Sequence, residues 1–108
     1  MDLEAIEWQA TRHPGVALHF YTKDRSANRV VALIRMAPGC GYPAHRHVGP
    51  EDVLVLQGGY RDAFGEHEAA TFVHYPAGSS HAPTAIDGPG AVDCVLLAVA
   101  HEGVVTLP

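Results

Sequence analysis

Histidine is the residue type in this sequence whose number and spacing point to chemistry. The chain contains eight histidines among 108 residues, an excess that indicates a metal site or proton chemistry. His45 and His47 are separated by one residue, and residues two apart in a β-strand point to the same face. We therefore expect both imidazoles to project together from one strand.

Two more residues complete a set of candidate metal ligands. Glu51 follows His47 by four residues, across a break at Gly49-Pro50, and a turn there brings its carboxylate toward the histidines. His81 follows a turn-forming segment, 76–80, and is expected to arrive from a second hairpin. Three imidazoles and one carboxylate suit Zn, Fe(II), Mn, Ni or Cu, without the thiolates of a closed structural zinc site. We predict one divalent ion, Zn or Fe(II) first, with Ni or Mn left open.

Short apolar segments between turn residues are the elements that must position these side chains. Eleven glycines and eight prolines punctuate the chain. Segments 29–36 and 91–100 are nearly continuous apolar runs, typical of strands covered on both faces. Segment 52–57 leads directly into Gly58-Gly59, as a strand does before a tight turn. This pattern predicts an all-β sandwich or barrel.

Composition limits the classes of protein that this chain can be. Hydrophobic residues make up 47% and charged residues 18% of the sequence, enough apolar content for one packed domain over residues 1–108. The net charge of -5 argues against partners such as nucleic acid or an anionic membrane. No apolar run approaches the roughly 20 residues of a membrane span, and the N-terminus lacks a signal-peptide pattern. We expect a cytoplasmic protein, with Cys40 and Cys94 as unpaired thiols.

Residues 39–58 resemble a motif of the cupin superfamily. The first cupin motif, G(X)5HXH(X)3,4E(X)6G, is matched at every fixed position, by Gly39, His45, His47, Glu51 and Gly58. This match includes three of the four candidate metal ligands.

The second cupin motif, G(X)5PXG(X)2H(X)3N, is retained in its middle and altered at its ends. Pro76, Gly78 and His81 match, whereas Ala70 and Ala85 stand where Gly and Asn are expected. Both departures fall at turn positions and leave the candidate ligand His81 in place. The second metal-binding motif is therefore expected over residues 76–85.

Within the superfamily, the stretch from Met36 to Thr84 is most similar to the ChrR-type cupin domain. The similarity rests on the segments H-R-H-V-G-P-E-D-V-L-V-L-Q-G, Y-R-D and Y-P-A-G-S-S-H-A-P. The resemblance implies a small antiparallel double-sheet β-barrel, of the cupin or jelly-roll type, with a metal near its mouth. It implies as ligands His45, His47, Glu51 and His81.

The resemblance does not extend to the sigma-factor-binding part of that family. In its type member the cupin follows an N-terminal zinc-binding domain that grips a sigma factor. The 44 residues before His45 hold no second Cys/His cluster. We therefore expect a stand-alone cupin without anti-sigma activity.

Residues beyond the ligand set have ordinary structural interpretations. Tyr60 and His74 are the candidates for a catalytic role, although strand packing and a surface position explain them equally, and no general base stands out. His67, between two glutamates, is expected at an exposed hairpin tip. Histidines 13, 19 and 101 have no evident partner. Candidates for an apolar pocket wall are Trp8, Met36, Phe64 and Phe72.

Two functions from different classes fit these observations. The first is a metal-dependent, dioxygenase-like enzyme, in which positions left open on the metal take a small substrate or dioxygen. The second is a non-catalytic zinc cupin that binds a small ligand or senses an oxidant. In both cases the partner is a small molecule, and we expect a homodimer because pairing protects edge strands.

Overall fold

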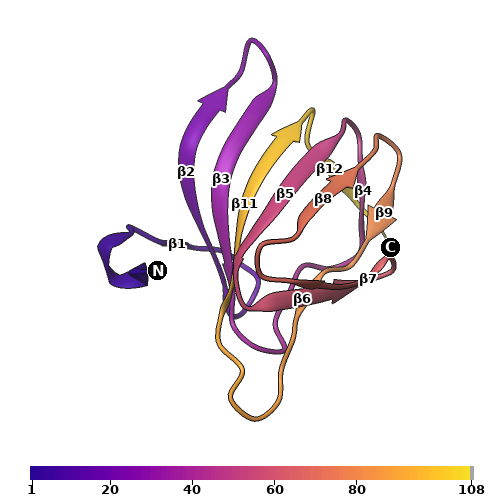
Figure 1. Cartoon of the computed structure of the whole chain (residues 1–108). Helices are drawn as coiled ribbons and strands as arrows, with labels where there is room; N and C mark the ends of the chain where they lie inside the picture. The colour runs from indigo at the N-terminus through magenta and orange to yellow at the C-terminus, as the bar shows by residue number, and fades with distance from the viewer. Residues whose placement is uncertain (108) are drawn as a thin grey trace.

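The structure is a computed structural model that describes residues 1–107, and its regular secondary structure is almost entirely β-strand (Figure 1). These residues hold one short 3-10 helix, η1, and no helix long and apolar enough to cross a membrane. The predicted all-β class is confirmed. The elements are η1 (Leu3–Ala5), β1 (Gln9–Ala10), β2 (Val16–Asp24), β3 (Arg29–Met36), β4 (His45–His47), β5 (Glu51–Gln57), β6 (Gly59–Asp62), β7 (Gly65–Glu68), β8 (Phe72–Tyr75), β9 (Ser80–His81), β10 (Thr84–Ala85), β11 (Cys94–His101) and β12 (Val104–Thr106).

A six-stranded antiparallel sheet, here called the large sheet, forms one wall of the molecule. Its strand order is β1-β2-β3-β11-β5-β8. The pair β3 and β11 lies at its centre, in a register that sets Met36 opposite Cys94. These strands contain the apolar runs noted in the sequence, and both of their faces are covered. Met36 and Cys94 are buried toward the interior, and Leu33 and Val95 are buried on the outer face.

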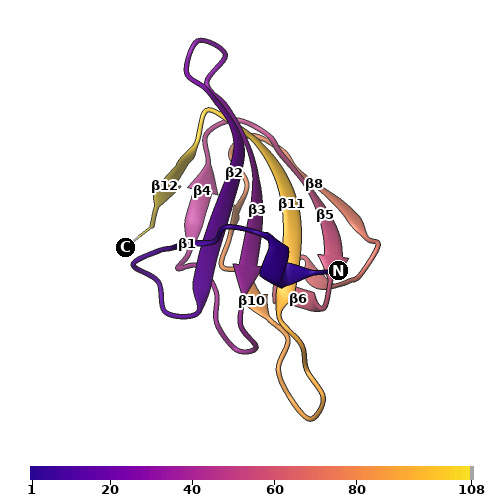
Figure 2. The same ribbon diagram turned by 90° about the vertical axis from the view of Figure 1, so that its left-hand side faces the viewer.

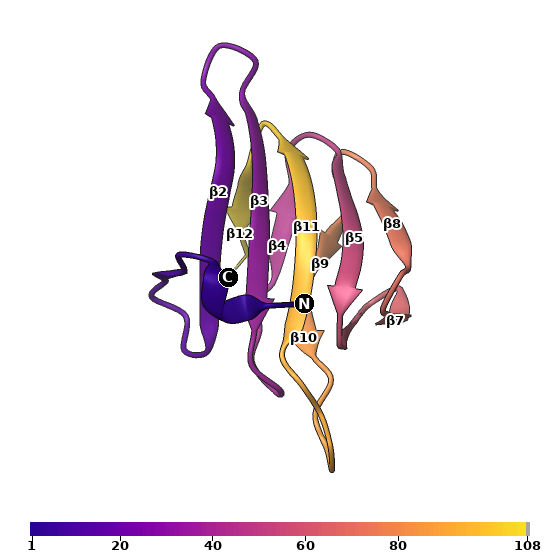
Figure 3. The ribbon, with the colours of Figure 1, turned by 60° about the vertical axis from the view of Figure 1, so that its left-hand side comes forward.

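The N-terminal segment covers part of that outer face. Figures 2 and 3 show η1 lying across β3 and β11 on the side away from the smaller sheets. The indole N–H of Trp8 donates to the Leu3 carbonyl oxygen at 3.0 Å, and the Arg35 guanidinium lies 5.6 Å from the centre of the Trp8 ring. Arg35 is the strand partner of Val95. Val95 is buried although it lies on the outer face, and burial of such an apolar side chain favours folding.

Two three-stranded sheets face the large sheet across the interior. Their strand orders are β10-β6-β7 and β12-β4-β9. Several of these strands are only two or three residues long, so each pair is joined by few backbone hydrogen bonds. Among residues 1–107 the three sheets do not join into one closed ring. The expected double-sheet architecture is present, with the correction that it is not closed as a true barrel.

The turn before β8 has a left-handed backbone conformation, which favours glycine, although alanine replaces the motif glycine there. Ala70 has a φ of 72°, in the left-handed region, which costs an L-residue about 1–2 kcal/mol. The turn is nevertheless held: the Ala70 N–H donates to the Val55 carbonyl oxygen at 2.8 Å, and the Thr71 N–H donates to the Glu68 carbonyl oxygen at 3.1 Å. The local hydrogen bonds therefore hold Ala70 in a conformation better suited to glycine.

Candidate metal centre

Strand β4 directs two histidines into the interior. Its burial alternates, with His45 and His47 buried and Arg46 exposed, as the spacing of two predicts. Strand β9 pairs with β4 and sets His81 directly opposite His45. Ligand atoms of the three imidazoles all lie within 4.8 Å of one another. The fold therefore groups three of the candidate ligands in an arrangement that suits a metal ion.

Two of these imidazoles are held by their Nδ1 atoms. The Nδ1–H of His45 donates to the carbonyl oxygen of Pro43 at 3.1 Å. The Nδ1–H of His81 donates to a carboxylate oxygen of Asp62 at 2.8 Å. A carbonyl and an ionised carboxylate only accept hydrogen bonds, so the proton of each neutral ring is on Nδ1. This leaves a lone pair on Nε2 of both rings, which is the state that binds a metal. In this structure the Nε2 of His81 accepts a hydrogen bond from Nε2 of His47.

His47 completes the group from a more buried position. Its Nε2 lies 3.0 Å from Nε2 of His81, and one ion with bonds of about 2.0–2.1 Å can join two nitrogens at this spacing. Burial, then the nearby His81 and His45, lower the pKa of His47 to about 4. Burial also lowers the pKa of His81. Both rings stay neutral at pH 7, as metal binding requires.

Asp62 is a buried carboxylate behind His81, and the sequence did not single it out. Its oxygens accept hydrogen bonds from the Tyr75 hydroxyl at 2.5 Å, His67 Nε2 at 2.9 Å, the Phe64 backbone N–H at 2.9 Å and His81 Nδ1. Burial by itself raises the pKa of Asp62, but the hydrogen bonds from Tyr75, His81 and His67 outweigh it and lower that pKa to about 2. Asp62 is therefore an anion at neutral pH.

Tyr60 and Tyr75 form a buried phenol pair beside the histidines. The two hydroxyls are hydrogen-bonded to each other, and both side chains are buried. The Tyr75 ring stacks on His47, with ring centres 5.4 Å apart. Burial raises the pKa of both phenols. Tyr60, a predicted catalytic candidate, therefore lies in the interior as a protonated hydrogen-bond donor.

The position predicted for His67 is wrong. Instead of lying at an exposed hairpin tip, His67 sits inside β7, opposite Tyr60, and is buried. The turn falls earlier, at residues 63–64. Strand alternation then turns Glu66 and Glu68 outward and His67 inward. The alternation of residues along the strand was the signal that could have placed His67 inside. Histidine counts as a polar residue, so its burial cannot be predicted unless its hydrogen-bond partner is known.

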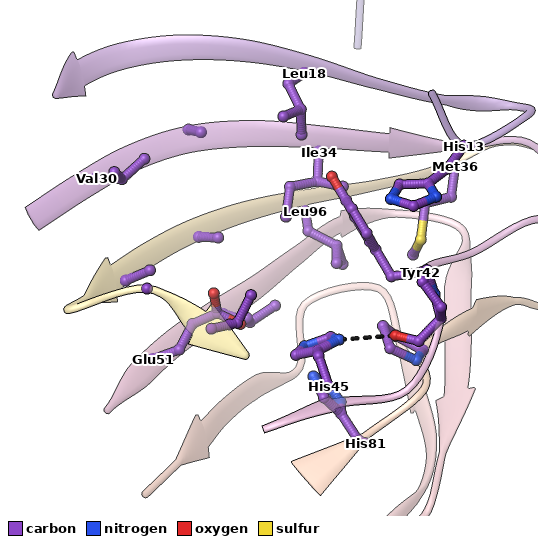
Figure 4. Close-up of a pocket in the computed structure, with 18 of the residues that line it drawn as sticks. His13, Leu18, Val30, Ile34, Met36, Tyr42, His45, Glu51, His81 and Leu96 are labelled. Carbon is purple, nitrogen blue, oxygen red and sulfur yellow. Dashed lines mark hydrogen bonds between the residues drawn. The ribbon is translucent and has the colours of Figure 1, made fainter. Parts of the chain in front are cut away.

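Glu51 lies in the same cavity as the histidines but outside their group. It begins β5 in the large sheet, and Figure 4 shows its side chain to one side of His45 and His81. Burial, then the charge of Asp52, raises its pKa to about 7. Without a metal its carboxyl is therefore partly protonated at neutral pH. Its role as the fourth ligand, implied by the motif, stays a prediction.

His74, the other catalytic candidate, lies on the outer face of the large sheet. It stands opposite Asp52 in the pairing of β5 with β8. Its Nδ1–H donates to a carboxylate oxygen of Asp52 at 2.6 Å, and its side chain is 56% exposed. Asp52 faces away from Glu51, as expected for neighbours in a strand. His74 therefore has no contact with the cavity in this structure.

A cavity of about 360 Å³ lies between the large sheet and the sheet β12-β4-β9 (Figure 4). This volume lies in the range of small-molecule sites, about 300–1,000 Å³. His45 and His81 face it from one side. The opposite wall is apolar and comes from β2, β3 and β11, and it includes Leu18, Ile34, Met36 and Leu96. His45 and His81 thus border a largely apolar cavity.

The wall of this cavity differs in part from the sequence prediction. Of the four predicted wall residues Met36 lines it, whereas Phe64 and Phe72 are 59% and 65% exposed and Trp8 packs outside the large sheet. His13, which had no evident partner, lines the cavity with its ring edge-on to Tyr42 at 5.2 Å. The loop before β2 carries His13, and a loop gives no periodic signal of where its side chains point.

Comparison with known families identifies the chain. A model of the ChrR cupin-like domain matches residues 1–102. This chain belongs to the ChrR cupin-like family. No relative was found among the curated proteins. The family match spans both cupin motifs, residues 39–58 and 76–85, of this ChrR-like cupin.

Solved structures share its fold. An RmlC-like cupin protein from Ralstonia eutropha has 20% identity and a TM-score of 0.84, over 100% of this chain and 77% of that chain. An acetylacetone dioxygenase from Acinetobacter johnsonii has 12% identity and a TM-score of 0.83, over 94% and 72%. At these identities the likeness concerns the fold alone, and it confirms the cupin fold of this ChrR-like cupin.

A third structure is more similar in sequence. The anti-sigma ChrR from Rhodobacter sphaeroides, crystallised in complex with SigE, has 30% identity and a TM-score of 0.76, over 91% of this chain. The ChrR-like cupin covers only 50% of that protein. The similarity therefore extends over half of ChrR.

Proposed function

We propose that this cupin is a metal-dependent, dioxygenase-like enzyme acting on a small apolar molecule. The observation that carries the proposal is the placement of His45 and His81 in the wall of a cavity of about 360 Å³. Because their protons are on Nδ1, hydrogen-bonded elsewhere, their Nε2 atoms carry the lone pairs that a metal binds. A ligand in the cavity thus meets the metal site directly.

The ligand set that we propose is His45, His47, His81 and Glu51, holding one divalent ion, Zn or Fe(II). An imidazole that binds a metal through its lone pair carries no charge, so Glu51 supplies the one negative charge toward the cation. Fe(II) supplies dioxygen chemistry at its open positions, and Zn supplies Lewis-acid chemistry. The protein holds the donor atoms and excludes water with an apolar wall.

We infer the substrate class from the lining of the cavity. Leu18, Ile34 and Leu96 offer only apolar contact, so the body of the substrate is apolar, and it carries an oxygen donor where it faces the histidines. A small diketone or hydroxy-ketone combines an apolar body with such oxygen donors. Support comes from the shared fold of the acetylacetone dioxygenase from Acinetobacter johnsonii.

Elemental analysis combined with oxygen uptake tests this proposal. Protein purified without added metal is analysed for Fe, Zn, Ni and Mn, and oxygen consumption is then recorded with a panel of small diketones. Near-stoichiometric iron with uptake that requires the diketone supports the enzyme. Protein that takes up no metal, even after reconstitution with Fe(II) or Zn, contradicts the metal site itself.

A non-catalytic zinc cupin is the second candidate function. The 30% identity to the anti-sigma ChrR favours it, because that protein acts in a regulatory complex. Zinc in the purified protein, no oxygen uptake, and saturable binding of a diketone in the cavity would support this alternative. Turnover of any diketone excludes it.

We also propose a homodimer in the cytoplasm. Strand β8 lies at one edge of the large sheet, and its Phe72 is 65% exposed. Pairing of two copies covers such an edge. Both cysteines are free thiols, Cys94 buried and Cys40 partly buried, as suits a reducing compartment. Light scattering that gives a mass of 11.5 kDa contradicts the dimer.

A further inference from the structure

Asp62 lies directly behind His81, and hydrogen bonds hold both oxygens of its carboxylate in place. The side chain is fully buried, and a buried carboxylate is tolerated only when its oxygens are hydrogen-bonded. Oδ1 accepts from His67 and from the Phe64 backbone N–H, whereas Oδ2 accepts from Tyr75 and from His81. Each oxygen thus has two donors from different directions.

We propose that Asp62 is a positioning residue of the metal centre, which keeps the proton of His81 on Nδ1 and thereby directs the Nε2 lone pair toward the ion. This inference rests on the proposed metal site. Asp62 lies behind the imidazole and acts through it. A carboxylate placed behind a metal-binding histidine in this way fixes the orientation of the ring and increases the basicity of the ligand atom.

Asp62 also contacts side chains that are hydrogen-bonded or packed against other residues of the site. Tyr75 donates to Oδ2 of Asp62 and shares a hydrogen bond with Tyr60. Tyr75 also stacks on His47. One buried network therefore orients His81 through its Nδ1 and supports the ring of His47 by packing. The hairpin β6–β7 supplies Asp62 and His67 to this network.

His45 offers an internal comparison. Its Nδ1–H is held by the carbonyl oxygen of Pro43, a backbone group that no side-chain substitution removes. His81 depends for the same tautomer on the side chain of Asp62. A substitution at Asp62 is therefore expected to affect His81 and to leave the tautomer of His45 unchanged.

The substitution Asp62→Asn has a predictable orientation. Because His67 and the Phe64 N–H both donate to Oδ1, the amide oxygen takes the Oδ1 position and the amide NH2 takes the Oδ2 position. The NH2 then faces Nδ1 of His81 as a donor. We expect the proton of His81 to move to Nε2, where it competes with the metal.

Long-range proton–nitrogen NMR of the metal-free protein tests the tautomer without any substitution at Asp62. The spectra are recorded at pH 7.5, and the His81 signals are identified by their loss in His81→Gln. The expected result is a proton on Nδ1 of His81 in the unsubstituted protein. A proton on Nε2 overturns the inference, and this readout does not require Asp62→Asn to fold.

Metal affinity gives the second readout. Zinc is titrated in competition with a chromophoric chelator, and Asp62→Asn is expected to bind it about 10–100-fold more weakly. The matched control is Asp93→Asn, which breaks the ion pair of Asp93 with Arg35 away from the histidines and is expected to retain the affinity. Folded Asp62→Asn that binds zinc as tightly as the unsubstituted protein overturns the inference. Failure of the unsubstituted protein to bind zinc contradicts the proposed function instead.

Discussion

Glu51 and Asp52 are adjacent in β5, and their carboxylates lie on opposite faces of the large sheet. Glu51 faces the cavity, whereas Asp52 accepts a hydrogen bond from His74 at the outer surface. Strand alternation therefore separates a carboxyl group that can serve the metal site from one that cannot. The two residues have different environments although both are carboxylic acids and are adjacent in the sequence.

Glu51→Gln is expected to weaken zinc binding at least about tenfold, because the amide removes the one negative charge of the proposed ligand set while it keeps the side-chain shape. Chelator competition at pH 7.5 measures the affinity. Glu68→Gln, at an exposed position in β7, is the control. An unchanged affinity in Glu51→Gln assigns the metal to the three histidines alone.

The same substitution is expected to stabilise the metal-free protein at neutral and alkaline pH. Burial raises the pKa of Glu51 from 4.5 to about 7 in the folded state. A raised carboxyl pKa adds stability below the unfolded value and withdraws it as the pH rises toward the folded value. The difference in unfolding free energy between Glu51→Gln and the parent should therefore grow between pH 4.5 and 7 and then level off. Denaturant unfolding in a chelating buffer measures it; a pH-independent difference contradicts the burial of an ionisable Glu51.

His47 is expected to act on stability in the opposite direction. Its pKa is lowered from 6.5 to about 4 by burial, so the unfolded chain binds a proton that the folded chain excludes. The metal-free protein should lose stability as the pH falls from 6.5 toward 4. Glu51→Gln is the right background for this measurement, because it removes the opposing change from Glu51. Stability that stays level across this range would show that His47 titrates normally.

His47→Ala is expected to abolish most metal binding, since it removes one of three grouped imidazoles. The test is the metal content of the purified variant, measured after reconstitution with zinc. His74→Ala removes an imidazole from the outer surface and should retain full occupancy. Full occupancy in His47→Ala would refute its assignment as a ligand.

Ala70→Gly is expected to stabilise the protein by about 0.5–1 kcal/mol. Glycine relieves the left-handed strain at Ala70, which exceeds the added entropy of the unfolded chain. A rise in melting temperature of about 2–6 °C should follow. Ala69→Gly, next to it and without a positive φ, is the control and should lower the melting temperature. Equal effects of the two substitutions contradict the strain.

The sequence allowed the histidine pair to be predicted because its geometry is local. In an extended chain, residues 45 and 47 share a face whatever surrounds them. The motif spacing that carries Pro76, Gly78 and His81 extended this prediction to β9, and the structure sets His81 opposite His45. Turn residues between short apolar segments similarly predicted the all-β class.

Other features depend on contacts that the chain order does not reveal. Asp62 and His81 are 19 residues apart, and the segment Y-R-D that contains Asp62 contributes to the family resemblance without indicating which groups its carboxylate contacts. The burial of His67 and the exposure of Phe72 were mispredicted from residue type alone, and the place of His13 at the cavity was not predicted. The burial or exposure of each of these side chains depends on whether a strand, a loop or solvent lies next to it in the folded protein.

The sequence by itself determined the strand pattern, the family and the three histidines of the candidate metal site, because periodicity and motif spacing are local properties of the chain. Tertiary structure alone decided the buried network of Asp62, the apolar cavity and the position of Glu51 to one side of the imidazoles. A buried polar group persists only where its partners are assembled around it, and that assembly exists only once the sheets have come together.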